Sequence, residues 1–221
     1  MTISATWMDY HEREVAAAMT ALRDDWPTLQ SWGAQLVDLF AAGGRLLAAG
    51  NGGSAAEAQH LTAELVGRFL TERRPYSAIC LSAETSSLTA IVNDYGAEEM
   101  FARQVQAHGR PGDVLILLST SGRSPNVLRA AGRAAEVGVT SWAVTGPGPN
   151  PLSSLCDDAL TICAPSTAAI QAGHLIAVHG LCAVVDETIA LAPPIISQQA
   201  RPMRVNIRDI HTSGLESELT G

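Results

Sequence analysis

The chain has 221 residues, a formal charge of −8 and 47% hydrophobic residues. This length suits one domain with an ordinary core. The acidic balance argues against a nucleic-acid groove or an anionic membrane surface, because both need clustered Lys and Arg. The N-terminus has no leader pattern, no uninterrupted apolar run reaches membrane length, and the four cysteines show no CxxC pairing. We therefore expect a soluble cytoplasmic protein with reduced cysteines.

The chain opens with two predicted helices, at residues 9–25 and 26–44, and the second stops at a glycine pair. Short apolar runs typical of buried strands follow, at residues 45–49, 76–81, 113–118, 140–145 and 158–163. Helical patterns separate these runs, at residues 54–69, 85–93, 98–108, 125–137 and 167–192. The alternation predicts an α/β fold in which helices cover both faces of a parallel sheet.

We expect residues 1–192 to form one domain that includes the N-terminal helices. Residues 193–221 lose periodicity and carry prolines at 193, 194 and 202, so we expect a loosely ordered tail there.

The run "GNGGSA" follows the first predicted strand and opens the next helix. Read literally, it fits the G-x-G-x-x-A dinucleotide fingerprint. The acidic residue that this fingerprint needs at the end of the next strand is missing, since the nearest candidate, Glu84, is too distant. The turn still lies where an open parallel sheet binds its ligands, beyond the carboxyl end of a strand.

The run "STSGRS" (119–124) follows another predicted strand, and Pro125 then starts a helix. Four hydroxyls and the free backbone N–H groups of a helix N-terminus suit a compact dianion. The alternative is an ordinary helix cap with a glycine turn. Two such turns at strand ends in one domain favour a phosphate ester as the ligand.

His60 and Glu64 are four residues apart on the helix after the first turn, so both project from one face. They are either a stabilising surface pair or chemical groups beside the ligand. The last helix carries Gln171 and His179 about 80° apart around its axis, whereas His174 and His179 are about 140° apart. The two histidines cannot easily line one site, so one of them is a hydrogen-bonded buried histidine, and spacing leaves open which.

Five stretches in order, "GNGGSAAEAQH", "AELVGRF", "IVNDYG", "PGDVLILLSTSGRS" and "IQAGHLIAVHG", resemble the phosphoheptose isomerases of the sugar isomerase (SIS) domain family. The resemblance runs from about residue 10 to 190. It implies a five-stranded parallel sheet of flavodoxin-like winding and a homotetramer with active sites at subunit interfaces. It also implies conversion of D-sedoheptulose 7-phosphate to D-glycero-D-manno-heptose 7-phosphate.

The resemblance also assigns roles to residues. It implies one zinc ion per subunit held by His60, Glu64, Gln171 and His179, with Glu64 and His179 moving protons. The residues implied as substrate contacts are Asn51, Gly52, Gly53, Ser54, Glu64, Asn93, Asp94, Ser119, Thr120, Ser121, Ser124 and Gln171. On this basis His174 is the structural histidine. Aldose-ketose interconversion needs a base, an acid and stabilisation of an enediolate, and these residue types can supply all three.

The match departs from the family just ahead of Gln171, where Ala168 and Ala169 replace an Asp-Arg pair. This change removes a candidate hydrogen bond to a sugar hydroxyl and leaves the identity of the sugar open. Arg123 replaces the usual Asn, and we interpret it as a solvated charge.

Two other functions remain to be weighed. A non-catalytic SIS-domain adaptor, resembling the protein that assists the replication initiator in some bacteria, would lack the catalytic Glu and His that this chain keeps. A sugar-phosphate-sensing regulator would normally carry a fused DNA-binding module, and the acidic N-terminal residues are too poor in basic clusters for that.

Overall fold

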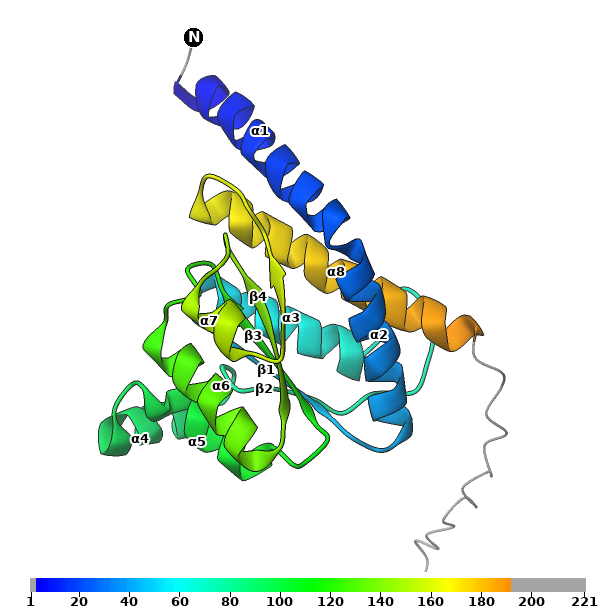
Figure 1. Ribbon diagram of the computed structural model, residues 1–221, viewed down its shortest axis with the longest axis vertical. Helices are drawn as coiled ribbons and strands as arrows, with labels where there is room; N and C mark the ends of the chain where they lie inside the picture. The colour runs from blue at the N-terminus through cyan, green and yellow to red at the C-terminus, as the bar shows by residue number, and fades with distance from the viewer. Residues whose placement is uncertain (1–2, 192–221) are drawn as a thin grey trace, which may run out of the picture. The chain divides into compact units, whose positions relative to one another are not determined.

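The computed structural model describes residues 3–191. The predicted tail, residues 193–221, lies outside the described residues, as does residue 192. The described elements alternate between helices and strands after two N-terminal helices, as the apolar runs predict (Figure 1). The strands are β1 (Leu46–Gly50), β2 (Ala78–Cys80), β3 (Val114–Ser119), β4 (Thr140–Thr145) and β5 (Asp158–Thr161). The helices are α1 (Ile3–Asp24), α2 (Trp26–Ala41), α3 (Gly53–Val66), α4 (Thr85–Tyr95), α5 (Glu99–His108), α6 (Pro125–Val137), α7 (Pro151–Leu155) and α8 (Thr167–Leu191).

The five strands form one parallel sheet in the order β2-β1-β3-β4-β5. This order is the flavodoxin-like winding that the resemblance implies, so that prediction is confirmed. β1 and β3 are neighbours, and Gly50 at the end of β1 pairs with Leu118 near the end of β3. The turns that follow these two strands therefore emerge side by side at the carboxyl edge of the sheet.

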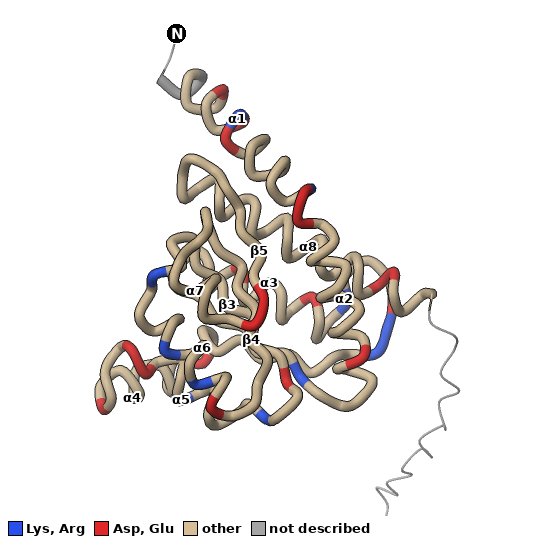
Figure 2. The backbone as a smooth tube through the Cα atoms, in the orientation of Figure 1, with Lys and Arg blue, Asp and Glu red and all other residues tan. Residues whose placement is uncertain are grey.

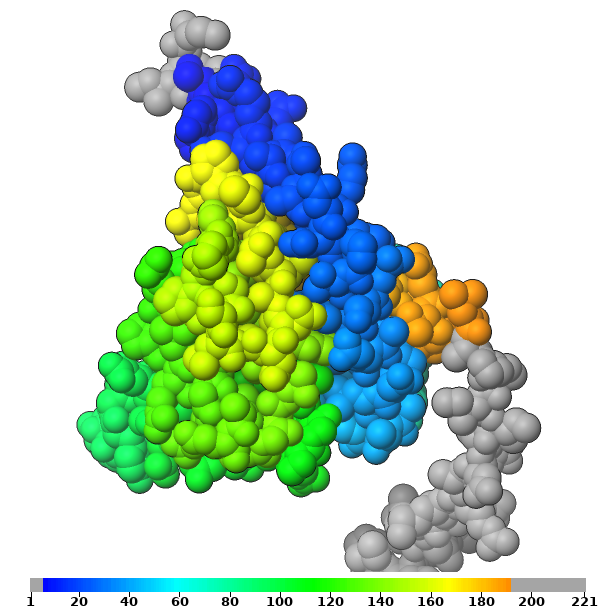
Figure 3. Space-filling model, in the orientation of Figure 1, coloured from blue at the N-terminus to red at the C-terminus, as the bar shows by residue number. Residues whose placement is uncertain are grey.

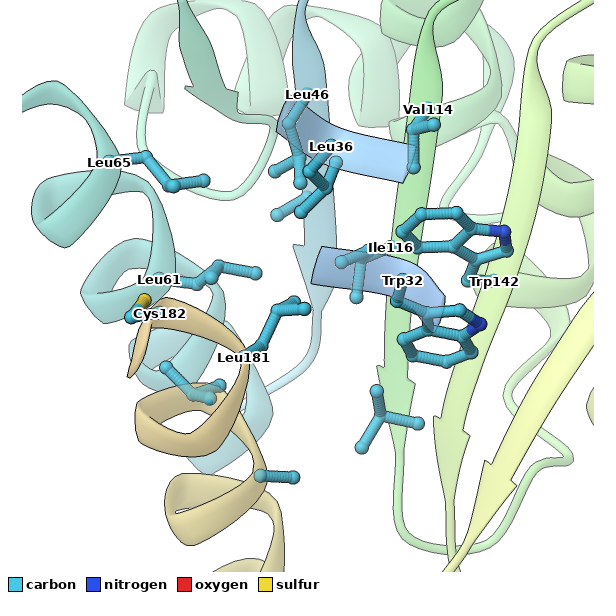
Figure 4. Packing of buried hydrophobic residues seen from close by; sticks show 14 of the residues in the cluster. Trp32, Leu36, Leu46, Leu61, Leu65, Val114, Ile116, Trp142, Leu181 and Cys182 are labelled. Carbon is cyan, nitrogen blue, oxygen red and sulfur yellow. The ribbon is translucent and has the colours of Figure 1, made fainter. Parts of the chain in front are cut away.

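Alternate residues of each buried strand feed two different cores, because side chains along a strand point to opposite faces. Leu46, Ile116 and Trp142 pack against α2, α3 and α8 on one face (Figure 4). Leu47 and Leu115 pack against α5 and α6 on the other. Strands covered on both faces read as continuous apolar runs, which is why the sequence revealed them.

Two tryptophans fix α2 on the first face. Trp32 of α2 stacks on Trp142 of β4 with ring centroids 4.7 Å apart, and both side chains are buried (Figure 4). The indole N–H of Trp32 donates to the Asp158 carboxylate at 2.7 Å. A buried indole N–H needs such an acceptor, so this contact sets the position of α2 along the sheet edge.

Several element boundaries differ from the sequence-based prediction, and one helix was missed. α1 begins at Ile3 rather than near residue 9, and α3 ends at Val66 rather than at residue 69. The short helix α7 was not predicted at all. It is stabilised by a capping box in which the Asn150 side chain accepts from the Ser153 N–H and the Ser153 hydroxyl accepts from the Asn150 N–H.

α8 is the one helix in the described residues that is long and apolar enough to cross a membrane by length and composition. More than half of its most apolar stretch, 56%, is buried inside the protein. It packs against α1, α2 and α3, which is the behaviour of a central core helix. The first turns of α1 extend past α8 (Figure 3), and Trp7, Met8 and Tyr10 are exposed there.

All four cysteines are free thiols. Burial raises the pKa of Cys182 to about 12 and the pKa of Cys156 to about 11. Both thiols are therefore protonated near neutral pH, which makes them weak nucleophiles and indicates a packing role.

Candidate active site

The turn after β1 brings the end of the strand and the first turn of α3 very close together. Only two residues separate the end of β1 at Gly50 from the start of α3 at Gly53. Gly52 has φ +56°, a left-handed conformation that favours glycine. A Cβ on Gly50 would lie 2.6 Å from the carbonyl oxygen of Ser54, so no side chain fits there. The turn presents the N-terminus of α3 at the sheet edge, where an anion is stabilised.

The turn after β3 gathers hydroxyl groups. The Ser119 Oγ lies 3.4 Å from the Ser124 Oγ, across a turn in which Gly122 has φ +59°. The Ser121 hydroxyl accepts the Arg123 N–H at 3.2 Å while its side chain remains exposed. The exposed position of Arg123 agrees with its interpretation as a solvated charge. α6 begins immediately afterwards, so the hydroxyls lie next to the free N–H groups of a helix start.

An amide pair that the sequence did not reveal joins the two turns. Asn51 and Asn126 exchange two side-chain hydrogen bonds, each 2.9 Å long. Asn126 lies in the first turn of α6, and it is buried. An asparagine at a helix start gives no periodic signal, so only the parallel pairing of β1 and β3 reveals its partner. The pair holds the two turns at a fixed separation.

Three of the four predicted metal-binding residues come together on α3 and α8. The His60 Nε2 lies 3.1 Å from the Glu64 Oε1 and 3.2 Å from the His179 Nε2. The side chains of His60 and Glu64 are 39% and 24% exposed, so solvent and small molecules can reach them. One carboxylate and two imidazoles in contact can accept, hold and return protons.

Phe69 is a further residue at this cluster that the sequence did not indicate. Its ring stacks on the His179 ring with centroids 5.7 Å apart and an interplanar angle of 25°. His179 also meets His60 edge-on, with centroids 5.0 Å apart. The His179 ring therefore contacts both an aromatic face and a second imidazole.

Gln171 lies at the other end of the site. Its amide occupies the space that a Cβ on Gly53 would fill, so it contacts the first residue of α3. His60 follows Gly53 by seven residues and His179 follows Gln171 by eight, so α3 and α8 run alongside each other in the same direction. Within residues 3–191 no hydrogen bond joins Gln171 to His60, Glu64 or His179.

The donor types at this cluster suit a zinc ion, since imidazole nitrogen and carboxylate oxygen are common zinc ligands. Among the described residues, however, no three His, Cys, Asp or Glu side chains converge as a closed metal site. His60 contacts both Glu64 and His179. The amide of Gln171 lies against Gly53, at the N-terminal end of α3. The arrangement supplies candidate ligands without itself forming a complete coordination shell.

His174 is buried completely on α8, in line with the expectation that it is the structural histidine. The expectation that a buried histidine here would be hydrogen-bonded is wrong. Within the described part of the chain neither ring nitrogen has a hydrogen-bond partner. Its Nδ1 lies 3.5 Å from the Glu57 Oε2, which also lacks one. Among the residues that the structure describes, the Glu57 carboxylate is the one charged group placed against this ring.

In the described range, residues 3–191, the side chains of Asn93 and Asp94 form no hydrogen bond with either turn. Both are exposed in the last turn of α4, and the Asn93 amide donates to the Asp94 carboxylate at 2.8 Å. α4 has no fully buried residue. The two side chains pair with each other rather than with the remaining predicted substrate contacts.

The two alanines ahead of Gln171 lie in the first turn of α8 and differ in their exposure to solvent. Ala168 is exposed, whereas Ala169 is completely buried and packs in a small cluster with Ala18 of α1 and Ile162. A long basic side chain at Ala169 would have to displace this cluster. The alanine is therefore matched to the docking of α1 on α8.

Comparison with known proteins gives a consistent result. The SIS domain family matches residues 10–146. A phosphoheptose isomerase of Streptomyces coelicolor is 58% identical over 179 residues, which cover 81% of this chain and 78% of the relative. A phosphoheptose isomerase of Rhodospirillum rubrum is 49% identical over 67% of this chain and 79% of its own length.

Solved structures agree with the sequence comparison. The phosphoheptose isomerase of Neisseria gonorrhoeae superposes with a TM-score of 0.76 and 35% identity, covering 84% of this chain and all of that protein. The phosphoheptose isomerase of Francisella tularensis gives the same TM-score with 34% identity, covering 85% of this chain and all of that protein. The similarity therefore covers more than four fifths of this chain in the structural comparisons.

Proposed function

This chain belongs to the phosphoheptose isomerase family of SIS-domain proteins, and on that premise we propose that it converts D-sedoheptulose 7-phosphate to D-glycero-D-manno-heptose 7-phosphate. The observation that carries the proposal is the contact of His60 with both Glu64 and His179. α3, which carries His60 and Glu64, starts at the turn after β1, and Gln171 of α8 contacts the same turn at Gly53. A phosphate anchor and a proton-transfer cluster within one site are what an aldose-ketose isomerase of a phosphosugar requires.

The substrate phosphate is proposed to bind at the turn after β3. Ser119, Thr120, Ser121 and Ser124 offer hydroxyl donors, and the start of α6 offers backbone N–H groups. A helix N-terminus carries partial positive charge, which favours a dianion. The turn from Asn51 to Ser54 and the amide of Gln171 would then contact the sugar chain. In this arrangement the carbonyl end of the sugar extends toward Glu64 and His179.

Proton transfer is proposed to use Glu64 and His179. Isomerisation removes a proton from C1 of the ketose, passes through an enediolate, and returns a proton to C2 of the aldose. Glu64 acts as the base for the carbon-bound proton. His179 serves ring opening or the opposite proton transfer, and its stacking on Phe69 keeps its ring in one orientation.

We propose that His60, Glu64, Gln171 and His179 hold one zinc ion. The two contacts of 3.1 and 3.2 Å are close to the roughly 3.3 Å that separates donor atoms around tetrahedral zinc with bonds near 2.0–2.1 Å. Gln171 is the weakest of the four as a ligand, and its amide lies against Gly53, about 10 Å along α3 from His60. It would have to turn away from Gly53 toward the histidines to join them at one ion. When bound, the ion would polarise the sugar carbonyl as a Lewis acid.

The proposed assembly is a cytoplasmic homotetramer with active sites at subunit interfaces. Exposed apolar side chains at the start of α1 and the exposed pair Asn93–Asp94 on α4 support it, since both offer surface for a second copy. The alternative function, a non-catalytic SIS-domain adaptor that binds a sugar phosphate, is less well supported. It leaves the contact between Glu64, His60 and His179 without a purpose.

The test is to incubate the purified chain with sedoheptulose 7-phosphate in deuterated water and to follow the products by proton NMR. Appearance of the aldose phosphate with deuterium at C2 is the expected result. Parallel samples with a chelator, and with zinc added back, test the metal. Absence of aldose from folded protein supplied with zinc would contradict the isomerase proposal, and other ketose phosphates would then be tried before the adaptor function was adopted.

A further inference from the structure

Arg73 and Asp186 form a buried ion pair outside the cluster described above. Arg73 lies in the loop after α3, and Asp186 lies on α8, two helical turns beyond His179. The Arg73 Nε donates to the Asp186 Oδ1 at 3.2 Å, and each side chain is only 5% exposed. Charged side chains are rarely buried to this extent unless they are paired and fully hydrogen-bonded.

The guanidinium of Arg73 closes the C-terminal end of α3. It donates to the carbonyl oxygens of Glu64 at 2.5 Å, Leu65 at 2.9 Å and Arg74 at 3.2 Å. α3 ends at Val66, so the carbonyls of Glu64 and Leu65 belong to the last turn, where no intrahelical N–H is left to bond them. A cation at this end also complements the helix dipole. The backbone of Glu64 itself is therefore anchored by Arg73.

Asp186 anchors the loop from the opposite side. Its Oδ2 accepts the backbone N–H groups of Leu70 at 3.1 Å and Thr71 at 3.0 Å. Burial alone would raise the pKa of Asp186, but the hydrogen bonds from Thr71, Leu70 and Arg73 outweigh it and hold this pKa below its usual value. The residue before Leu70 is Phe69, whose ring stacks on His179.

Arg73 and Asp186 thus bond the backbone at or next to the residues that position both proposed proton-transfer groups. Figure 2 shows the basic residues of this loop beside the C-terminal half of α8. Arg73 bonds the backbone of Glu64, while Asp186 pins the residues that follow Phe69 and so fixes the ring against which His179 stacks. Both anchors are joined by one ion pair.

We propose that Arg73 and Asp186 are positioning residues for the isomerisation, which set the placement of Glu64 and His179 without touching the substrate. This inference rests on the proposed function. A bidentate, planar guanidinium can bond several carbonyls and a carboxylate at once, which the single ammonium of a lysine cannot do. Small displacements of reacting groups reduce turnover strongly, so loss of the clamp should affect the chemical step more than substrate binding.

The test compares wild-type protein with Arg73→Lys, Arg73→Ala and Asp186→Asn in steady-state assays on sedoheptulose 7-phosphate. We expect kcat to fall about tenfold or more in each variant, with KM changed by less than about threefold. Millimolar guanidinium ion in the assay should restore part of the kcat of Arg73→Ala. The ion can bind in the space that the arginine side chain leaves between the α3 carbonyls and Asp186. If Arg73→Ala does not fold, Arg73→Lys and Asp186→Asn carry the test.

Arg129→Ala is the matched control. This variant also loses a guanidinium that pairs with a carboxylate, since the Arg129 Nε lies 2.7 Å from Glu99, but Arg129 bonds neither the α3 backbone nor the loop that carries Phe69. Its kcat should stay at the wild-type value and should not respond to guanidinium. Retention of wild-type kcat by folded Arg73→Lys and Asp186→Asn would overturn the positioning role alone. An inactive wild-type protein would instead overturn the proposed function, and the role with it.

Discussion

The Nε2 of His179 lies 3.2 Å from the Nε2 of His60, although 119 residues separate them in the chain. Two imidazole nitrogens at this distance share either a proton or a bound cation, because two bare lone pairs would repel each other. Glu64 contacts the same His60 nitrogen at 3.1 Å. The three side chains therefore form one contact network, and a substitution at one member will alter the contacts of the others.

Glu64→Gln should lower turnover by orders of magnitude while leaving the site assembled. Glutamine keeps the length of the side chain and can still contact His60, but it cannot accept a proton from carbon. We expect kcat to fall by about 10²–10⁴-fold, with substrate binding retained in calorimetric titrations. Glu72→Gln is the control, because Glu72 is an exposed carboxylate whose side chain is 88% accessible. Near-normal turnover in Glu64→Gln would remove Glu64 as the base.

Ser121→Ala should mainly raise KM. Ser121 is exposed in the turn after β3, and its hydroxyl, which accepts the Arg123 N–H, keeps its own hydrogen free to donate to a phosphate. Loss of one donor to a dianion weakens substrate and transition state alike, so we expect KM to rise about tenfold with kcat nearly unchanged. Ser31→Ala, at an exposed serine of α2, serves as the comparison. An unchanged KM in Ser121→Ala would refute the phosphate assignment of this turn.

The sheet could be predicted from sequence because its strands are apolar on both faces, as the run from Val114 to Ser119 illustrates. α7 could not, since five residues give no helical period and its capping box depends on two side chains, Asn150 and Ser153. The early end of α3 was missed although Gly67 directly follows Val66 as the C-cap, a stop signal that the sequence carries. What the sequence could not reveal is that Arg73 reaches back from a loop to bond the last carbonyls.

The site was only partly readable from sequence, for reasons of geometry. His60 and Glu64 are four residues apart on one helix, so their contact follows from helical spacing. Gln171 and His179 share a broad face of α8, yet eight residues separate them by about 12 Å along the axis. That rise places Gln171 at Gly53 and His179 at His60. Angles around the helix axis do not include this distance along it, and they do not reveal that α3 and α8 run parallel.

The buried pair Glu57–His174 should show strong coupling in unfolding experiments. Removing one partner leaves the other as a buried polar side chain without its neighbour 3.5 Å away. We expect His174→Leu to lower the free energy of unfolding in urea by about 1–3 kcal/mol. The double variant Glu57→Leu/His174→Leu should regain part of this loss, because two apolar side chains can replace a buried polar pair. Strictly additive effects in this double-mutant cycle would show that the two residues do not interact.

Asp186 should make the stability of the protein depend on pH in the acid range. Its pKa in the folded chain lies below the value of about 3.9 expected when the chain is unfolded. Between the two values the unfolded chain binds a proton that the folded chain does not, so the free energy of unfolding rises with pH there. The contribution is complete above the unfolded pKa and is lost as the pH falls through the folded one.

Urea midpoints measured from pH 3 to pH 7 can isolate this contribution. Asp186→Asn should be less stable than the wild type at pH 7, because it loses the charge that pairs with Arg73. Its stability should fall less steeply than that of the wild type below about pH 4. Glu72→Gln, at an exposed carboxylate, should follow the wild-type curve closely. Parallel curves for wild type and Asp186→Asn would mean that the Asp186 carboxylate is as easily protonated in the folded chain as in the unfolded one, and that the hydrogen bonds from Leu70, Thr71 and Arg73 add nothing to its acidity.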